Sequence, residues 1–360
     1  EYATAKENLN DHLYKSDEEQ QVILTTAVDI IKLPYDSNEY TTLTGNGSMP
    51  YQIVVSQDGN VYIALDYLAQ YTALQYSVEQ EPLHIIINNQ WGTKTFSDVI
   101  KEESVRLDAD IKSPILKKEA VGDKVTVLEQ EEEWTKVLTA DGYIGYMKSK
   151  KLSDSYEEQV TSDFRAAEYT SIHKDYDMNL LWHQVTSQDS NDALAADIQD
   201  VKGVNVISPT WFSISSNDGD ISSLASSDYV DTAHQNDMEV WGLMDNFSTD
   251  IDTDTVLGTT TSRENLEGQL ITEALNYQLD GINIDIESLP EETSESYVQF
   301  MRELSVKCRN NNLVLSVDVP PPYSFNEHYS QKELGEVVDY VIIMGYDEHY
   351  VGSDAGSVAS

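Results

Sequence analysis

The second half of the chain alternates short apolar runs with amphipathic segments. The segments have apolar residues three or four positions apart, which predicts helices near 191–201, 227–237 and 262–278 and a fourth after residue 287. Strands that alternate with helices predict βα units around a parallel sheet. The runs with the length and composition of buried strands are Leu180–Val185, Val204–Phe212, Val240–Phe247, Asp280–Glu287, Leu313–Val319 and Tyr340–Asp347. The fourth helix is expected to pass through Val298, Met301, Leu304, Ser305 and Cys308.

The first half of the chain has short β-like runs separated by turn residues. Residues 21–102 are expected to form an α+β domain with a short helix at Leu65–Tyr71, and residues 103–153 a small all-β barrel. Residues 1–20 are polar and predict a frayed helix or a disordered lead-in, and residues 154–174 predict an acidic linker. The β-like runs are Val22–Leu24, Tyr51–Val55, Val61–Ile63, Leu83–Ile87, Val125–Leu128, Trp134–Val137 and Tyr143–Met147.

The predicted fourth strand has one polar face. Because side chains alternate along a strand, Asn283, Asp285 and Glu287 share one face, and three isoleucines share the other. The isoleucines suit packing against helices, so the polar face is expected to line a cleft. The Cα atoms of Asp285 and Glu287 would be roughly 6–7 Å apart, which couples the proton affinities of their carboxyl groups.

Two motifs in this half resemble the landmarks of family 18 glycoside hydrolases. The first motif, which resembles the family signature, is Asp280-Gly281-Ile282-Asn283-Ile284-Asp285-Ile286-Glu287. It departs from the signature at Asn283, where chitinases usually carry Asp. In this respect it resembles the spore-cortex lysin branch of the family, which accepts Asn at that position. Met344-Gly345-Tyr346-Asp347 resembles the Met-x-Tyr-Asp at the end of the family's sixth strand. The resemblance implies a (β/α)8 barrel over residues 175–360, with its site at the carboxyl ends of the strands.

Residues 175–360 are fewer than the ~250 of a typical barrel, and only six strands are predicted in them. The barrel is therefore expected to be truncated, with on the order of 60–80 further residues in the native protein. The outermost predicted strands would then keep unpaired apolar edges.

The resemblance also implies a retaining mechanism in which the substrate's own 2-acetamido group attacks the sugar C1. Glu287 would act as general acid and then as general base. Asp285 would orient the acetamide and stabilise its developing charge, with Asn283 bonded to Asp285, and Tyr346 would donate to the acetamide oxygen. The other supporting or substrate-binding candidates are Asp280, Met344, Asp347, Asp318 and Trp211, although a Trp at a strand end is as often a core residue. His183, His349 and Asp245 are also expected near strand ends, without an assigned role.

The N-terminal domains resemble wall-associated modules of bacteria. Residues 21–102 are similar to copper amine oxidase N-terminal-like domains, a name that implies no copper, and His84 alone is too few ligands for a metal site. Residues 103–153 resemble bacterial SH3-like domains, with Trp134 and the Gly142-Tyr143-Ile144-Gly145-Tyr146 ending in place. Binding of cell-wall peptides and a spacer role both stay open for this domain.

Composition mainly excludes classes of partner. The 360 residues carry 22 Lys and Arg against 64 Asp and Glu, a formal net charge of −42, which excludes nucleic acid and disfavours anionic membranes. No apolar run reaches the 18 residues of a membrane span, and the single cysteine, Cys308, excludes an intrachain disulfide. Asp250–Asp254 begins like a calcium loop but lacks the required Gly and Glu further on, so no metal and no cofactor is expected.

These observations predict an extracellular or cell-surface bacterial hydrolase. Its expected substrate is peptidoglycan or a related wall glycan, cut at β-1,4 bonds next to N-acetylglucosamine. The alternatives are a chitinase, an endo-β-N-acetylglucosaminidase, or a catalytically silent glycan-binding module. Because lectin-like members of the family usually lose the acid, the presence of Glu287 favours an enzyme.

Overall fold

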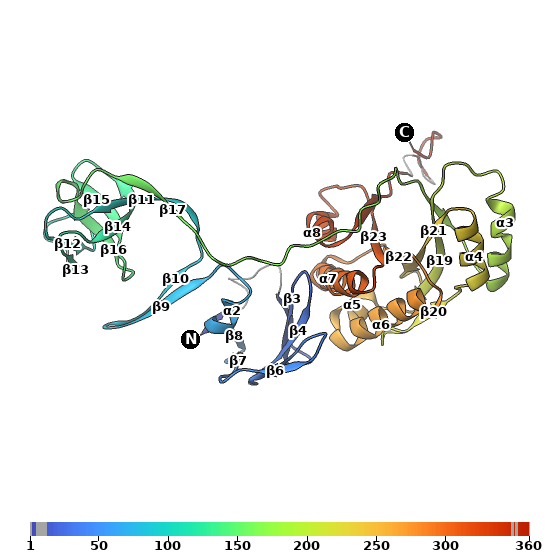
Figure 1. Ribbon diagram of the computed structural model, residues 1–360, viewed down its shortest axis with the longest axis horizontal. Coiled ribbons are helices and arrows are strands. Elements are labelled where there is room, and N and C mark those ends of the chain that lie inside the picture. The colour runs from blue at the N-terminus through green and yellow to red at the C-terminus, as the bar shows by residue number, and fades with distance from the viewer. Residues whose placement is uncertain (1, 5–12, 347–348, 350–351, 360) are drawn as a thin grey trace. The chain divides into compact units, whose positions relative to one another are not determined.

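The computed structural model describes residues 2–4, 13–346, 349 and 352–359 (Figure 1). They form two compact units. One is Ile63–Ala166 with the start of the chain, and the other is Thr4–Tyr62 with Ala167–Ser360. The range 21–102, predicted as one domain, is thus divided between the two units.

The larger unit is built on a sheet of six parallel strands that follow one another in chain order. This confirms the six predicted βα strands. The strands are β18 (Leu180–His183), β19 (Val206–Ile214), β21 (Glu239–Asp245), β22 (Gly281–Asp285), β23 (Val314–Val319) and β24 (Tyr340–Ile343), and β20 (Ile221–Ser223) pairs antiparallel with the end of β19. Among the described residues the sheet is part of a barrel and does not close, and the apolar side chains of Leu181, Val341 and Ile343 on its outermost strands are exposed.

Helices cover the apolar face of this sheet. Ile282, Ile284 and Ile286 are fully buried in one cluster with Leu270 and Leu304 of the helices, as the alternation along the strand predicts. The helical segments are η2 (Gln188–Ala193), α3 (Leu194–Asp197), α4 (Ser227–Gln235), α5 (Thr253–Gly258), α6 (Thr260–Asn276), η3 (Glu291–Thr293), α7 (Ser294–Asn310), η4 (Glu327–Tyr329) and α8 (Gln331–Val337).

An antiparallel sheet from the N-terminal segment belongs to the same unit. Its strands are β2 (Leu13–Ser16), β3 (Gln21–Thr25), β4 (Ile30–Pro34), β5 (Glu39–Thr41) and β6 (Asn46–Ser48), paired in that order. The Tyr14 hydroxyl donates to the Gly258 carbonyl at 3.0 Å, and the Tyr14 ring lies 4.4 Å from the Arg263 guanidinium. Residues 13–16 are thus not the predicted frayed or disordered lead-in, because buried Tyr14 fixes β2 against the helices.

The same segment caps helix α6. Thr261 and Glu264 have the spacing of a capping box, but the helix begins one residue earlier, at Thr260, and Glu264 pairs with Lys32. The Glu19 carboxylate instead accepts from the backbone N–H and the hydroxyl of Thr261, at 2.8 and 2.6 Å. A carboxylate at this end of a helix satisfies free N–H groups and is favoured by the helix dipole.

The smaller unit is almost entirely β. Its seven-stranded antiparallel sheet has the order β13-β12-β16-β15-β14-β11-β17, around a core that includes Val105, Val125, Val137 and Met147. The strands predicted near residues 125, 134 and 143 are present, and β17 lies within the range predicted as a linker. The elements are α2 (Leu65–Leu68), β9 (Gln75–Gln80), β10 (Leu83–Asn88), β11 (Gly92–Asp98), β12 (Glu103–Arg106), β13 (Ile115–Glu119), β14 (Lys124–Gln130), β15 (Trp134–Leu138), β16 (Ile144–Lys148), η1 (Ser149–Lys151) and β17 (Tyr156–Val160). The chain also forms β1 (Tyr2–Thr4), β7 (Val54–Gln57) and β8 (Asn60–Ala64).

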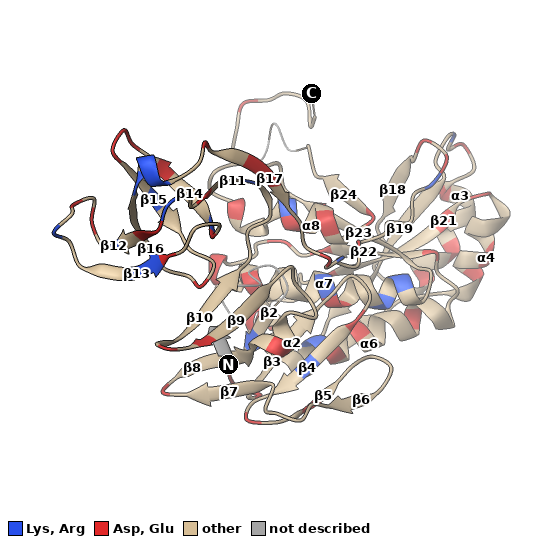
Figure 2. Ribbon diagram, turned by 60° about the vertical axis from the view of Figure 1, so that its left-hand side comes forward, with Lys and Arg blue, Asp and Glu red and all other residues tan. Residues whose placement is uncertain are grey.

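Acidic residues are spread along the ribbon of both units, and basic residues are sparser (Figure 2). This distribution matches the net charge of −42. In the part of the chain that the structure describes, no helix has the length and apolar character needed to cross a bilayer.

Candidate active site

Three aspartates lie side by side at the carboxyl ends of neighbouring strands. Asp245 of β21 is in register with Asp285 of β22. Ile284 of β22 pairs with Val317 of β23, so Asp318 lies across from Asp285 one residue further on. Neighbouring strands are about 4.8 Å apart, which brings their carboxyl groups close together. This aspartate row is buried, with exposed fractions of 6%, 8% and 1% for Asp245, Asp285 and Asp318.

The two ends of the row are hydrogen-bonded. One oxygen of Asp245 accepts from the Ser213 hydroxyl at 3.1 Å, and the other from the Phe247 backbone N–H at 3.1 Å. At the other end, Asp318 Oδ2 accepts from Asn283 Nδ2 at 2.7 Å and from Trp182 Nε1 at 3.0 Å. Because β18 and β23 are not neighbours in the sheet, the bond from Trp182 crosses its concave face.

The middle of the row is left without such support. Asp285 Oδ1 is buried and has no hydrogen-bond partner among the described residues. Asn283 was expected from the sequence to bond to Asp285, and the structure corrects this expectation. Its amide instead joins β23, donating to Asp318 and accepting from the Ser316 hydroxyl at 2.6 Å.

Burial and crowding of like charges govern the protonation of the row. Burial raises the pKa of Asp285 to about 7, and the carboxyl groups of Asp318, Glu287 and Asp245 add to the increase. Burial also raises the pKa of Asp318 to about 7, against the opposing effect of its bonds from Asn283 and Trp182. Burial raises the pKa of Asp245 too. The row therefore holds at least part of a proton at neutral pH.

Glu287 follows β22 and is half-buried, and its carboxyl group is close enough to raise the pKa of Asp285. The Asn246 side chain fixes its backbone: Asn246 Oδ1 accepts from the Glu287 N–H at 3.0 Å, and Asn246 Nδ2 donates to the Glu287 carbonyl at 3.0 Å. Asn246 was not identified as a functional candidate from the sequence. The signal that could have found it is its place directly after Asp245, at the end of the adjacent strand.

Tyr346 lies at the open side of this cluster. Its ring is 44% exposed and meets the Trp182 indole edge to face at 6.3 Å, and its hydroxyl donates to Met344 Sδ at 3.1 Å. Trp182 therefore connects Tyr346 with Asp318 of the aspartate row. Asp347, the next residue of the motif, lies outside the described residues.

Trp211 is a core residue, which corrects the suggestion that it stacks on a sugar. It is 1% exposed, and its indole N–H donates to Asn191 Oδ1 at 2.8 Å. Its ring packs 4.9 Å from that of Tyr229. A stacking residue must offer an open ring face, and Trp211 has none.

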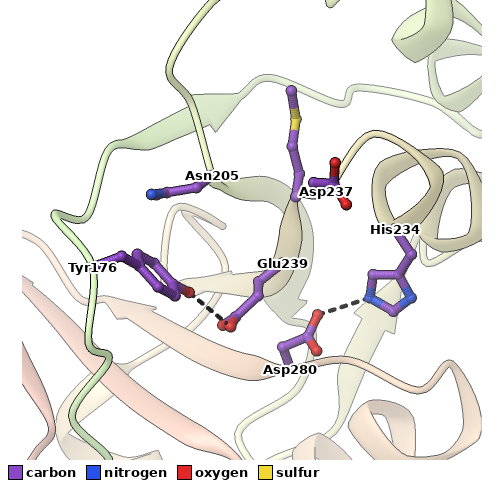
Figure 3. Close-up of a pocket in the computed structure, with 7 residues that line it drawn as sticks. Tyr176, Asn205, His234, Asp237, Glu239 and Asp280 are labelled. Atoms are coloured by element: carbon purple, nitrogen blue, oxygen red, sulfur yellow. Dashed lines mark hydrogen bonds and ion pairs between the residues drawn. The ribbon is translucent and has the colours of Figure 1, made fainter.

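Asp280 lies at the opposite end of β22 from Asp285, which corrects its expected supporting role. The two residues are five positions apart along the strand, or roughly 16 Å. Asp280 Oδ2 accepts from the Val240 N–H at 2.8 Å and lies 2.8 Å from His234 Nε2. Figure 3 shows this pair in a separate cavity of about 450 Å³ at the amino ends of the strands. Asp280 therefore fixes the start of the strand, away from the carboxyl ends.

In the described part of the chain, no group of three or more His, Cys, Asp or Glu residues is arranged to hold a metal ion. The calcium-like stretch has a structural use instead. Asp252 caps α5, accepting from the Asp254 N–H at 3.2 Å and from the Thr255 hydroxyl at 2.8 Å.

Comparison with known protein families gives two matches. Residues 215–358 match the model described as glycosyl hydrolases family 18, and residues 104–153 match the bacterial SH3 domain. The first match contains the aspartate row, Glu287 and Tyr346. The second confirms the SH3-like prediction, whereas the copper amine oxidase N-terminal-like domain finds no counterpart among these matches.

Three curated proteins of Bacillus are similar to parts of the chain. An uncharacterized glycosylase of B. subtilis, YvbX, is 28% identical over 169 residues, which are 44% of this chain and 49% of that protein. The putative sporulation-specific glycosylase YdhD of B. subtilis is 32% identical over 31% of this chain and 28% of its own length. The cortical fragment-lytic enzyme of B. anthracis is 30% identical over 30% of this chain and 26% of its own length. The chain thus spans half or less of each.

Proposed function

We propose that this chain, a glycoside hydrolase with a family 18 domain, cleaves β-1,4 bonds next to N-acetylglucosamine in peptidoglycan or a related wall glycan. The observation that carries the proposal is the position of Asp285. Its buried carboxyl has an oxygen without a partner, beside the backbone-anchored Glu287 and at the carboxyl end of a parallel strand. Such strand ends form the active sites of barrel enzymes.

The proposed reaction is retaining and assisted by the substrate. Glu287 protonates the leaving glycosidic oxygen while the sugar's acetamido oxygen attacks C1 to form an oxazolinium ion. Asp285 accepts the acetamide N–H and stabilises the positive charge, and Tyr346 donates to the acetamide oxygen. Glu287 then removes a proton from the water that opens the ring. The Tyr346 hydroxyl has a single proton, which it donates to Met344 Sδ in the structure, so substrate binding would turn this hydroxyl from Met344 to the acetamide oxygen.

The names of the relatives favour a bacterial wall glycan over chitin. They include a cortical fragment-lytic enzyme and a putative sporulation-specific glycosylase. A polymeric wall substrate places the protein outside the cell or at its surface. We infer that the SH3 domain holds the enzyme on wall material, and that residues 21–102 derive from a stalk-type module of the copper amine oxidase N-terminal-like class.

Product analysis tests the glycan and the bond together. The whole protein is incubated with purified peptidoglycan and, separately, with chitin oligomers, and the new reducing ends are identified by mass spectrometry. We expect fragments that end in reducing N-acetylglucosamine from peptidoglycan, and a rate on chitin oligomers at least about tenfold lower. Faster cleavage of chitin would replace the wall-glycan proposal with the chitinase alternative, and binding without any cleavage would indicate the glycan-binding module.

A further inference from the structure

The chain has an amide where an acid would most simply share a proton with Asp285. Asn283 lies two residues before Asp285 on the same strand face, and its side chain turns toward β23. An amide cannot take up a proton at neutral pH. Any proton that Asp285 gives up inside the protein must therefore go to another carboxyl group.

Asp318 is placed to receive it. It lies across from Asp285 in the sheet register and is 1% exposed, so it is shielded from bulk water. Its Oδ2 already accepts two N–H donors, from Asn283 and Trp182, while its Oδ1 has no partner among the described residues. Asp285 Oδ1 is in the same situation. Each carboxyl group thus keeps one free oxygen for a shared proton.

The groups around this pair do not offer a better partner. The ionisable groups that act on the two carboxyls are Asp245 of β21, Glu287 after β22, Tyr297 of α7 and Tyr329 of η4. Among the described residues, no Lys or Arg is among the groups that shift either carboxyl. Asp245 has both oxygens occupied by Ser213 and Phe247. Without a nearby cation, one bound proton is the simplest way for Asp285 and Asp318 to coexist.

We propose that Asp318 is the proton partner of Asp285, so that the acid which shares the proton lies on β23 and Asn283 serves to hold that acid in place. The role in the reaction rests on the proposed function. In the resting state that we propose, the proton is on Asp285 and Asp318 is the neighbouring carboxylate, and the two groups interact electrostatically. When the acetamide takes on positive charge, the proton moves to Asp318 and Asp285 becomes the carboxylate. It returns when the oxazolinium ring opens, so no proton is gained or lost.

Asp318→Asn separates proton sharing from a purely structural role. The amide oxygen of Asn can still accept from Trp182 and Asn283, but the side chain cannot take the proton. In protein labelled with ¹³C at Asp carboxyl groups, NMR titration should show the Asp285 midpoint fall by about one pH unit or more, because its anionic neighbour is gone. An unchanged midpoint, with the melting temperature preserved, would overturn the proposal.

Kinetics test the role of the pair in the reaction. Asp318→Asn should lower kcat of the whole protein by about 10- to 100-fold with KM changed less than about threefold. The double variant Asn283→Asp/Asp318→Asn returns an acid to the strand of Asp285, and should recover kcat to within about threefold of the wild type. The dependence of kcat on pH should be shifted in Asp318→Asn and should return toward that of the wild type in the double variant.

The two readouts distinguish the possible failures. A lowered midpoint with unchanged kcat would show that the shared proton has no part in catalysis, and would overturn the proposed role. Loss of kcat without recovery in the double variant would do the same, because a second acid available to share the proton with Asp285 would then not be sufficient for the reaction. Wild-type protein that cuts no glycan would refute the proposed function, while the titration would still decide whether Asp285 and Asp318 share a proton.

Discussion

Glu287→Gln is expected to lower kcat by about 10²–10⁴-fold, because Gln keeps the shape of the side chain but cannot donate a proton to the leaving oxygen. Folding should be little affected, since Asn246 bonds to the backbone of Glu287 and not to its side chain. The bound substrate loses no contact that needs the charge, so KM should change much less than kcat.

The measurement is steady-state kinetics of the whole protein on a glycan with its natural sugar leaving group. Glu291→Gln is the matched control, because Glu291 is an exposed residue of η3 close in sequence. Its kcat should equal that of the wild type. Unchanged turnover in Glu287→Gln would remove Glu287 from the mechanism.

Removing the N-acetyl groups of the substrate should abolish cleavage. In the proposed reaction the acetamido oxygen is the nucleophile, and no second carboxylate takes its place. In the proposed reaction Asp285 accepts the acetamide N–H, and Asp318 is 1% exposed, so neither carboxyl group is placed to attack C1. A thiazoline mimic of N-acetylglucosamine resembles the oxazolinium ion and should inhibit competitively.

Partly de-N-acetylated oligomers test this prediction, with the same oligomers after chemical re-acetylation as the control. The rate on the de-N-acetylated substrate should fall by at least about 10³-fold and return on re-acetylation. Efficient cleavage of a plain glucan would contradict substrate assistance and would require a protein nucleophile.

The strand alternation predicted the two faces of β22 because it depends only on local geometry. Asn283 and Asp285 lie on the polar side of β22, and Ile282 and Ile284 pack in the core on the other side, as a period of two requires. The six parallel strands were predicted for the same reason, because the spacing of apolar residues along the chain differs between strands and helices. The aspartate row itself needs the register between strands, which no single run of sequence contains.

Trp211 was misplaced because the predicted strand was too short. The predicted run ends at Phe212, but β19 continues to Ile214 and pairs there with β20, so Trp211 lies inside the strand and is buried. Asp280 was misplaced for a different reason. It belongs to the same motif as Asp285, but five residues of extended strand put it at the other end of the sheet.

The remaining contacts join segments that are far apart in the chain. Glu19 caps α6 across 242 residues, and Trp182 reaches Asp318 across 136 residues. Sequence spacing contains no signal for such pairs, because the curvature of the sheet and the docking of the N-terminal strands decide them. The spacing of Thr261 and Glu264 is that of a capping box, but the carboxylate that caps α6 is that of Glu19, far earlier in the chain.

The configuration of the first product tests the central claim most directly. Proton NMR can follow the whole protein as it cleaves an N-acetylated oligosaccharide, faster than the anomers interconvert. Because the acetamido group and then water attack C1 in turn, the β anomer should appear first, and the α anomer only later as mutarotation proceeds. Initial release of the α anomer would mean that water attacks C1 directly, and would contradict a substrate-assisted reaction at Asp285 and Glu287.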